Sequence, residues 1–327
     1  MSQLTEALEI DPKAESERII ATLRESVHRV MRRRGAVVGI SGGVDSSVVL
    51  ALSVRAFGPE RVAAIMMPER ESAADTERLS RSVARHFGVE PILDDMTPAL
   101  DGFGCYRRRD EAIRRLFPEY DPRSGYKAKI ALPPGLLERD SLNVFVLTVI
   151  APTGETFSRQ LPLEEYLQIV AASNLKQRSR MAMLYYHAEV RHFAVVGTAN
   201  KNEHEQGFFV KFGDGGVDIR PIAHLFKTQV YRLAEYLDVP EEIRRRPPTT
   251  DTYSAASTQE EFFFRLPFPL LDALWSAQER NVPIDTVAAE AGLTVEQVRR
   301  VFRDLDRKRR TTEYLRLAPV ALDGTCQ

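Results

Sequence analysis

The chain has 327 residues, of which 43% are hydrophobic and 28% are charged, and its acidic and basic residues nearly cancel at 46 against 45. This length supports one large domain or two small ones, with a core that needs no metal or disulfide. The near-neutral charge argues against a partner such as duplex DNA or an anionic membrane, because both demand a strong positive field. The two cysteines lie far apart, and neither a signal peptide nor a long apolar run is evident. We therefore expect a cytoplasmic protein in a reducing compartment.

The first part of the chain alternates predicted helices and strands. Apolar residues at helical spacing, short buried β-rich runs and terminating glycines define these segments. In chain order they are a helix at 14–34, a strand at 36–40, a helix at 46–57, a strand at 62–67, a helix at 75–87 and extended chain at 91–93. Alternation with short connections predicts an α/β fold: a doubly wound, mainly parallel, Rossmann-like sheet with helices on both faces.

This alternation breaks between about residues 97 and 162, which we interpret as an insertion in a single domain spanning 1–327. Prolines and the run Tyr106-Arg107-Arg108-Arg109 favour irregular chain, whereas β-rich runs at 142–150 and 155–161 predict a β-hairpin. The later predicted segments are helices at 163–172 and 175–191, a strand at 193–196, a loop-rich stretch at 197–221, a helix at 226–237 and a helical C-terminal part from about 262 to 327.

A glycine-rich loop, Gly39-Ile40-Ser41-Gly42-Gly43-Val44-Asp45-Ser46-Ser47, lies where the first predicted strand meets a helix. Paired glycines let consecutive backbone N–H groups form an anion nest, and the helix adds the positive end of its dipole, so phosphate is the expected ligand. Asp45 would repel phosphate unless a cation lay between them, which makes it a candidate Mg²⁺ ligand. The alternative is an ordinary glycine turn capped by Ser46.

The loop lacks the Gly-Lys-Ser/Thr ending of a Walker A loop and resembles the SGGxDS loop of the N-type ATP pyrophosphatases. Those enzymes cleave ATP between the α- and β-phosphates and activate an acid or carbonyl group as an adenylate. The resemblance implies that residues 39–47 bind ATP, and it leaves the acceptor open.

Motifs in the second half of the chain reduce the number of possible acceptor substrates. The segment Asn174-Leu175-Lys176-Gln177-Arg178-Ser179-Arg180-Met181 resembles the NxxxRxRM helix of the NAD synthetases. Further motifs follow in that family's order: Gly197-Thr198, Glu203, a run from Gly207 to Asp218, Lys227-Thr228-Gln229 and Pro247-Pro248-Thr249-Thr250-Asp251. The chain is therefore similar to the ammonia-dependent NAD synthetases from Gly39 onward, apart from the insertion.

The resemblance implies that Thr198, Lys227 and Thr249 contact ATP, and that Glu203 binds Mg²⁺ opposite Asp45. Two carboxylates completed by phosphate oxygens and water suit this ion. Lys227 would neutralise charge on the pyrophosphate leaving group, so we expect it to be catalytic.

Arg178, Lys211 and Asp218 match positions that hold the dinucleotide substrate, and Asp214 matches the carboxylate near the ammonia. Asp214 would take the proton that the attacking amine loses, which makes it a second expected catalytic residue. Each of these side chains also has a structural alternative. The lysines would be solvated, Arg178 would be a surface ion-pair partner, and the aspartates would stabilise turns among the glycines.

The implied reaction is adenylation of the carboxylate of nicotinate adenine dinucleotide (deamido-NAD) by Mg-ATP, followed by attack of ammonia to give NAD. An amide ligase acting on another carboxylate remains open. The chain reads Thr249-Thr250-Asp251 where the family has PTAD or PSAD, residues 260–265 are unusually aromatic, and Arg307-Lys308 replaces a His-Lys pair. A nucleotide-sensing regulator is the third alternative, because residues 284–298 have helix-turn-helix spacing and the basic run 307–310 follows.

The resemblance also implies a homodimer that shares the dinucleotide site, with Met181, Leu184 and Tyr185 at the interface. Only about 35 residues precede the first strand, fewer than the ~50 of a small domain. Free ammonia or a separate glutaminase subunit is therefore the expected nitrogen source, and no nucleic acid or membrane is an expected partner.

Overall fold

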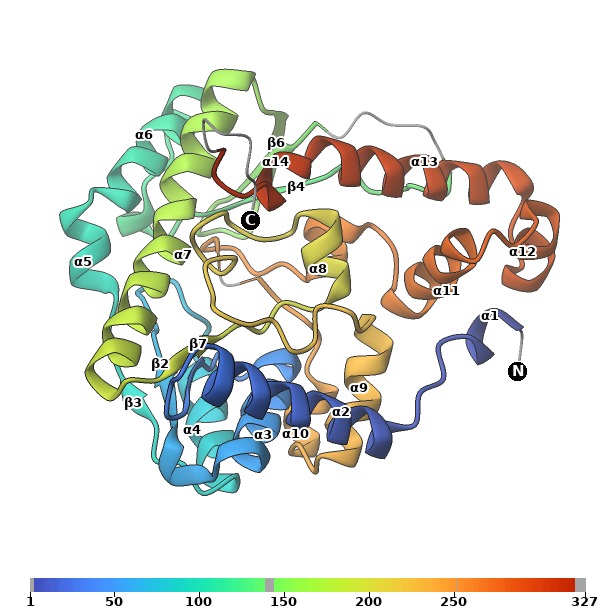
Figure 1. Ribbon diagram of the computed structural model, residues 1–327. Coiled ribbons are helices and arrows are strands. Elements are labelled where there is room, and N and C mark those ends of the chain that lie inside the picture. Colours follow the sequence, from blue (N-terminus) through green and yellow to red (C-terminus); the bar gives the residue numbers. More distant parts are fainter. Residues whose placement is uncertain (1–2, 139–143, 251, 321–327) are drawn as a thin grey trace.

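A four-stranded parallel sheet in the order β3-β2-β1-β7 forms the centre of the computed structural model, which describes residues 3–138, 144–250 and 252–320 (Figure 1). β1 (Ala36–Gly39) pairs with β2 (Val62–Met66) on one side and with β7 (Ala194–Val196) on the other. The short β3 (Ile92–Leu93) continues the sheet beyond β2. β2 and β7 are buried throughout, as expected of strands covered on both faces.

Successive residues of β1 point to opposite faces of the sheet and meet different helices. Ala36 and Val38 pack in a cluster with α2 (Pro12–Arg24), α3 (Val44–Phe57), α4 (Thr76–His86) and α9 (Lys227–Tyr236), and α10 (Glu241–Arg245) packs beside α9. Val37 packs instead against Ala188 of α7 (Leu163–Arg191). The predicted doubly wound α/β fold is confirmed.

A second, antiparallel sheet in the order β4-β5-β6 lies within the segment that we interpreted as an insertion. The predicted hairpin corresponds to β5 (Val146–Ile150) and β6 (Thr156–Gln160), while β4 (Lys127–Ala131) is a strand that the sequence analysis missed. The expectation of irregular chain before the hairpin is wrong, because α5 (Thr97–Gly102) and α6 (Cys105–Leu116) form there. Charged residues on most positions of α6 obscure its apolar stripe, which packs on α7.

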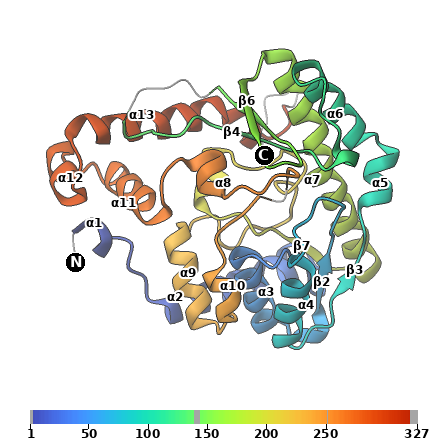
Figure 2. The same ribbon diagram turned by 180° about the vertical axis from the view of Figure 1, so that it is seen from behind.

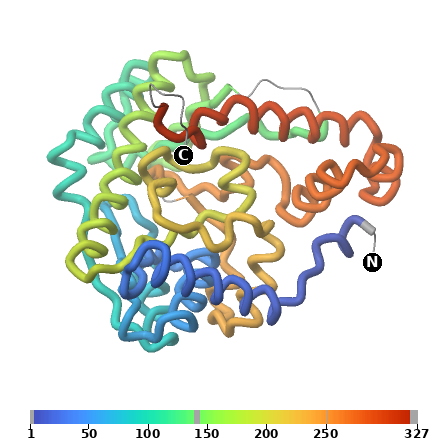
Figure 3. The backbone as a smooth tube through the Cα atoms, in the orientation of Figure 1, coloured from blue at the N-terminus to red at the C-terminus, as the bar shows by residue number. Residues whose placement is uncertain are grey.

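Three further helical segments differ from the predictions. The predicted helices at 163–172 and 175–191 form one uninterrupted helix, α7, which Figure 3 shows as a continuous coil. α8 (Lys201–Gln206) lies inside the stretch predicted to be loop, and it begins with a capping box between Asn200 and Glu203. The first predicted helix is α2 followed by a π-helical turn, Glu25–Val30.

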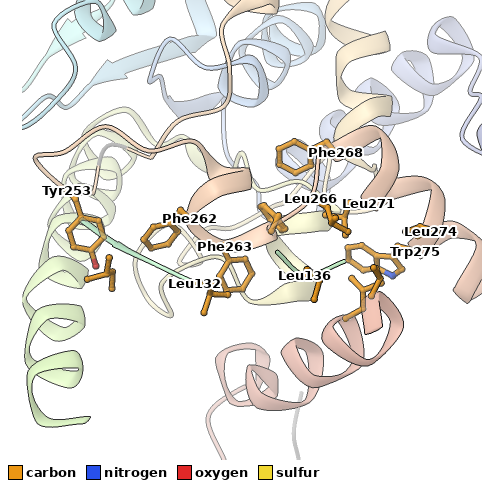
Figure 4. Close-up of a cluster of buried hydrophobic side chains, with 14 of the residues drawn as sticks. Leu132, Leu136, Tyr253, Phe262, Phe263, Leu266, Phe268, Leu271, Leu274 and Trp275 are labelled. Atoms are coloured by element: carbon orange, nitrogen blue, oxygen red, sulfur yellow. The ribbon is translucent and has the colours of Figure 1, made fainter. Parts of the chain in front are cut away.

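The C-terminal part is helical over the described residues, as predicted. A π-helical turn (Glu260–Phe264) leads into α11 (Phe268–Glu279), α12 (Ile284–Ala291), α13 (Val295–Thr311) and α14 (Glu313–Arg316). Figure 4 shows the buried cluster that joins this part to the segment around Leu132 and Leu136. Figures 1 and 2 place α1 (Gln3–Glu6) beside α11 and α12, far along the chain.

Within the described ranges, every helix is too short or too polar to cross a lipid bilayer.

Candidate active site

A cavity of about 790 Å³ lies at the carboxyl ends of β1, β2 and β7. The strand order reverses here, since β2 follows β1 on one side and β7 joins β1 on the other. Crevices at such switch points are where open α/β sheets bind ligands. The cavity wall combines the glycine-rich loop, the middle of α7, the segment around α8, the start of α9, residues 246–250, Thr252 and Tyr253.

Most of the predicted phosphate loop faces this cavity: Gly39, Ile40, Ser41, Gly43, Val44, Asp45 and Ser46 line it. The N-terminus of α3 has Gly43 at the cap position and no side-chain cap, which leaves its first N–H groups for a ligand.

The two remaining loop residues have structural positions. Gly42 has φ +68°, and a Cβ there would lie 2.8 Å from the Cβ of Leu79, so glycine is required for both the turn and the close approach of α4. Ser47 is fully buried, and its hydroxyl donates to the carbonyl of Gly43 at 2.8 Å.

Asp45, Glu203 and Lys227 form a charged cluster on the wall of the cavity. The Lys227 ammonium, only 1% exposed, forms an ion pair with Asp45 Oδ2, and Asn200 Nδ2 donates to Asp45 Oδ1 at 3.0 Å. Burial lowers the pKa of Lys227, but the charges of Asp45 and Glu203 outweigh it and hold this pKa above its usual value.

Glu203 is the second carboxylate of the cluster. Its Oε1 accepts from Gln259 Nε2 at 3.0 Å, and burial together with the negative charge of Asp45 raises its pKa to about 8. In the described parts of the chain, no three His, Cys, Asp or Glu side chains gather as metal ligands. The donor set nevertheless fits Mg²⁺, which needs one or two carboxylates completed by phosphate oxygens and water.

Arg178 and Lys211 lie on the wall of the cavity. Arg178 Nε donates to the carbonyl of Lys211 at 3.3 Å. The ammonium of Lys211 donates to the carbonyls of Tyr314 at 3.0 Å and Leu317 at 2.8 Å, so this cation contacts the C-terminal segment.

The two predicted aspartates have different positions. Asp214 lines the cavity, where its Oδ1 accepts from Val210 N at 2.7 Å. The residue is exposed, but desolvation by the surrounding protein atoms raises its pKa to about 6. Asp218 is not among the lining residues. Its carboxylate accepts from Tyr185 Oη at 3.0 Å and from Val195 N at 2.8 Å, so it ties its loop to α7 and β7.

Thr198 and Thr249 also line the cavity, and the backbone of Thr249 forms an isolated antiparallel β-bridge with Thr258.

Four residues that line the cavity were not assigned a role from the sequence: Arg180, Arg246, Gln259 and Lys308. Nor was Asn200, which is fully buried behind Asp45. Arg246 pairs with Asp75 at 3.0 Å, and Lys308 donates to the carbonyl of Phe263 at 2.8 Å. Asn200 carried a readable signal, since Asn-x-x-Glu is a capping-box pattern. The others depend on contacts between distant segments.

Fold and site together define a nucleotide-binding α/β protein with a phosphate loop at the carboxyl edge of its sheet. The sequence profile of the NAD synthase family matches residues 15–114 and 139–317, and the chain belongs to this family. The unmatched residues 115–138 lie within the segment 97–162 interpreted as an insertion.

Relatives span nearly the whole chain. An NH(3)-dependent NAD(+) synthetase of Mesorhizobium japonicum is 51% identical over 313 residues, covering 96% of this chain and 97% of the relative. Another from Rhizobium meliloti is 50% identical over 96% of this chain and 93% of the relative.

Solved structures support the fold at low identity. An NH3-dependent NAD synthetase from Campylobacter jejuni matches with a TM-score of 0.62 at 19% identity, covering 96% of this chain and 100% of that one. An NMN synthetase from Francisella tularensis matches with a TM-score of 0.59 at 21% identity, covering 96% and 99%.

Proposed function

We propose that this protein is an ammonia-dependent NAD synthetase. It would adenylate the carboxylate of deamido-NAD with ATP, release pyrophosphate, and amidate the adenylate with ammonia to give NAD and AMP. One observation supports this most directly. In this member of the NAD synthase family, the glycine-rich loop with its Asp45 lines the same cavity as Glu203 and Lys227. The NH(3)-dependent relatives point to ammonia as the nitrogen source, with a separate glutaminase subunit as the alternative.

ATP would lie with its phosphates on residues 39–47 and its remaining contacts on Thr198 and Thr249. Charge develops on the pyrophosphate as the bond between the α- and β-phosphates breaks. Lys227 is buried beside the loop, and an ammonium in a low-dielectric site stabilises such charge more strongly than one in water.

Asp45 and Glu203 are the residues that would hold Mg²⁺. Both offer hard oxygen donors, and desolvation together with the charge of Asp45 raises the pKa of Glu203, so a cation bound between the two carboxylates would favour its ionised form. When bound, the ion would neutralise phosphate oxygens.

Arg178 and Lys211 would pair with the pyrophosphate and carboxylate of the acceptor. Asp214, with a pKa of about 6, is mostly ionised at neutral pH, so it can attract ammonium and accept the proton released as nitrogen attacks.

We further propose a homodimer that completes the dinucleotide site. α7 exposes apolar side chains near its end, with Tyr186 56% and Val190 65% exposed. Tyr185 of this helix holds Asp218, so pairing α7 with its copy would bring Asp218 to the shared site. Met181 and Leu184 already line the cavity. Sedimentation should give a dimer, and a fully active monomer would overturn this assignment.

The regulator alternative keeps only part of its basic surface, because Arg309 and Arg310 are exposed but the lysine between Arg307 and Arg309 is buried. Lys308, in the middle of the basic run, is 4% exposed and pairs with Asp304 at 2.8 Å, and α12 and α13 pack against α11.

The proposal is tested by measuring AMP and pyrophosphate release with ATP, ammonium and a panel of carboxylates. We expect both products with deamido-NAD and neither with aspartate or citrulline as acceptor. Release of ADP and phosphate would contradict the ATP pyrophosphatase chemistry. Turnover with another carboxylate but not with deamido-NAD would leave that chemistry standing and overturn NAD synthesis.

A further inference from the structure

The N-terminus of α9, which carries Lys227, is only partly capped from within the helix: Gln229 Oε1 accepts from the N–H of Phe226 at 2.9 Å. The residue at the cap position is Phe226, whose side chain holds no hydrogen-bond acceptor. The first N–H groups of a helix have no partner within it and must find one elsewhere. Here the N–H of Lys227 donates to Asn202 Oδ1 at 2.9 Å, and the N–H of Thr228 donates to Asp272 Oδ2 at 2.9 Å.

Asp272 supplies this cap from α11, 44 residues farther along the chain than Thr228. Its carboxylate, 0% exposed, also accepts from Thr228 Oγ1 at 2.8 Å and from Asn202 Nδ2 at 2.6 Å. A carboxylate accepts and does not donate when ionised, so it turns the Asn202 amide with its NH₂ toward Asp272. The oxygen of Asn202 then faces the N–H of Lys227.

These bonds join α8 and α9, two of the three helices that bear the charged cluster. α8 contributes Asn200, which donates to Asp45, together with Glu203, and α9 contributes Lys227. One turn beyond Asp272, Trp275 meets Phe226 edge to face with ring centroids 5.4 Å apart. These contacts with α11 therefore fix both the position of the first turn of α9 along its axis and the rotation of that turn about the axis.

We propose that Asp272 is a positioning residue for Lys227, acting through Asn202 and the first turn of α9. The inference rests on the proposed function, because it gives Lys227 the task of stabilising the leaving pyrophosphate. Asp272 contacts no substrate in this scheme. It sets where the ammonium lies, and a displacement of about 1 Å at a reacting centre can cost on the order of a hundredfold in rate.

The test uses deamido-NAD-dependent exchange of labelled pyrophosphate into ATP, measured without ammonia on the full-length protein. This exchange reports adenylate formation alone. Asp272→Ala should slow it by about tenfold to a hundredfold at saturating ATP and leave the KM for deamido-NAD within about twofold. Thr228→Val, which removes one of the three bonds to Asp272, should give a smaller loss and keeps the test usable if Asp272→Ala does not fold.

A double-mutant cycle separates positioning from general damage. If Asp272 acts through Lys227, then Asp272→Ala or Thr228→Val should add little to the loss caused by Lys227→Ala. If the exchange rate of the double mutant is instead reduced by the product of the two single-mutant factors, the two residues act independently and the inference is overturned. Leu274→Ala, at a fully buried position of the same helix, is the control: it should lower the melting temperature and keep the exchange rate of the folded protein. A wild-type protein without deamido-NAD-dependent exchange would instead overturn the proposed function itself.

Discussion

Lys176 and Glu69 form an ion pair 2.9 Å long in which the two side chains are only 1% and 0% exposed. The same ammonium donates to Glu71 Oε2 at 2.7 Å and to the carbonyl of Thr252 at 3.0 Å, and Glu71 pairs with Arg109. A buried network thus ties α6, α7 and the loop after β2 to the segment that borders the cavity.

Replacing Lys176 with methionine should strongly destabilise the protein, because it leaves buried carboxylates without their cation. Breaking a buried pair in this way costs about 3–5 kcal/mol, whereas an exposed pair is worth about 0–1 kcal/mol. Arg107→Met is the matched control, since Arg107 pairs with Glu111 on the surface of α6 with the side chains 63% and 46% exposed. Urea unfolding should separate the two variants, and similar losses in both would contradict this interpretation.

Asp45→Asn should abolish turnover while the fold survives. The amide keeps the size of the side chain but removes the charge that faces Lys227 and the proposed Mg²⁺. AMP release measures the activity and thermal unfolding measures the fold. Partial recovery with Mn²⁺ in place of Mg²⁺ would support the metal role, and undiminished turnover would exclude it.

The raised pKa of Glu203 predicts that the free energy of unfolding, measured without substrates or Mg²⁺, depends on pH. With a native pKa of about 8 against an ordinary value of 4.5, the native state holds a proton that the unfolded chain has released between these values. The free energy of unfolding therefore falls as pH rises through this window, by at most about 1.4 kcal/mol per pH unit.

Glu203→Gln removes that dependence, so the variant should gain stability relative to the wild type as the pH rises from about 5.5 to about 8.5, a range that covers most of the window. Urea unfolding of both proteins at the two pH values measures the difference. An equal difference at both values would show that Glu203 does not titrate as its surroundings indicate.

Lys211 and Lys227 should have separable kinetic roles. Lys211→Ala removes a charge-assisted hydrogen bond to the acceptor worth about 1.5–3 kcal/mol, so acceptor binding should weaken on the order of tenfold to a hundredfold with ATP affinity nearly unchanged. Lys227→Ala should instead slow adenylate formation with any acceptor. Steady-state kinetics with each substrate varied in turn distinguish the two patterns. Unchanged deamido-NAD kinetics in Lys211→Ala would argue against its role in the acceptor site.

The parts of this protein that could be predicted from sequence are those coded locally. The buried strands, the glycine loop and the helix that follows it all depend on neighbouring residues, and the parallel sheet follows from their order. α6 was missed because its charged residues conceal a narrow apolar stripe, and α8 because it has only 6 residues.

The side-chain contacts that join distant segments within the site could not be predicted, because no local sequence pattern indicates them. Asn200 meets Asp45 across 155 residues, Lys176 meets Glu69 across 107 residues, and the bond of Asp218 to Tyr185 appears only once α7 lies beside its loop. Such pairs depend on tertiary packing, which periodicity and spacing within one segment do not encode.

α7 has 29 residues without glycine or proline, and it begins at the antiparallel sheet and ends at β7. At 1.5 Å per residue it is a rod of roughly 43 Å, and unbroken helices bend only gently. Because one continuous helix connects the two sheets, we expect them to move together and not to rotate apart as two rigid bodies. Entry and exit of substrates must then rely on displacement of the surrounding loops, so turnover should respond to loop stiffness, for example to solvent viscosity, more than to any movement of one half against the other.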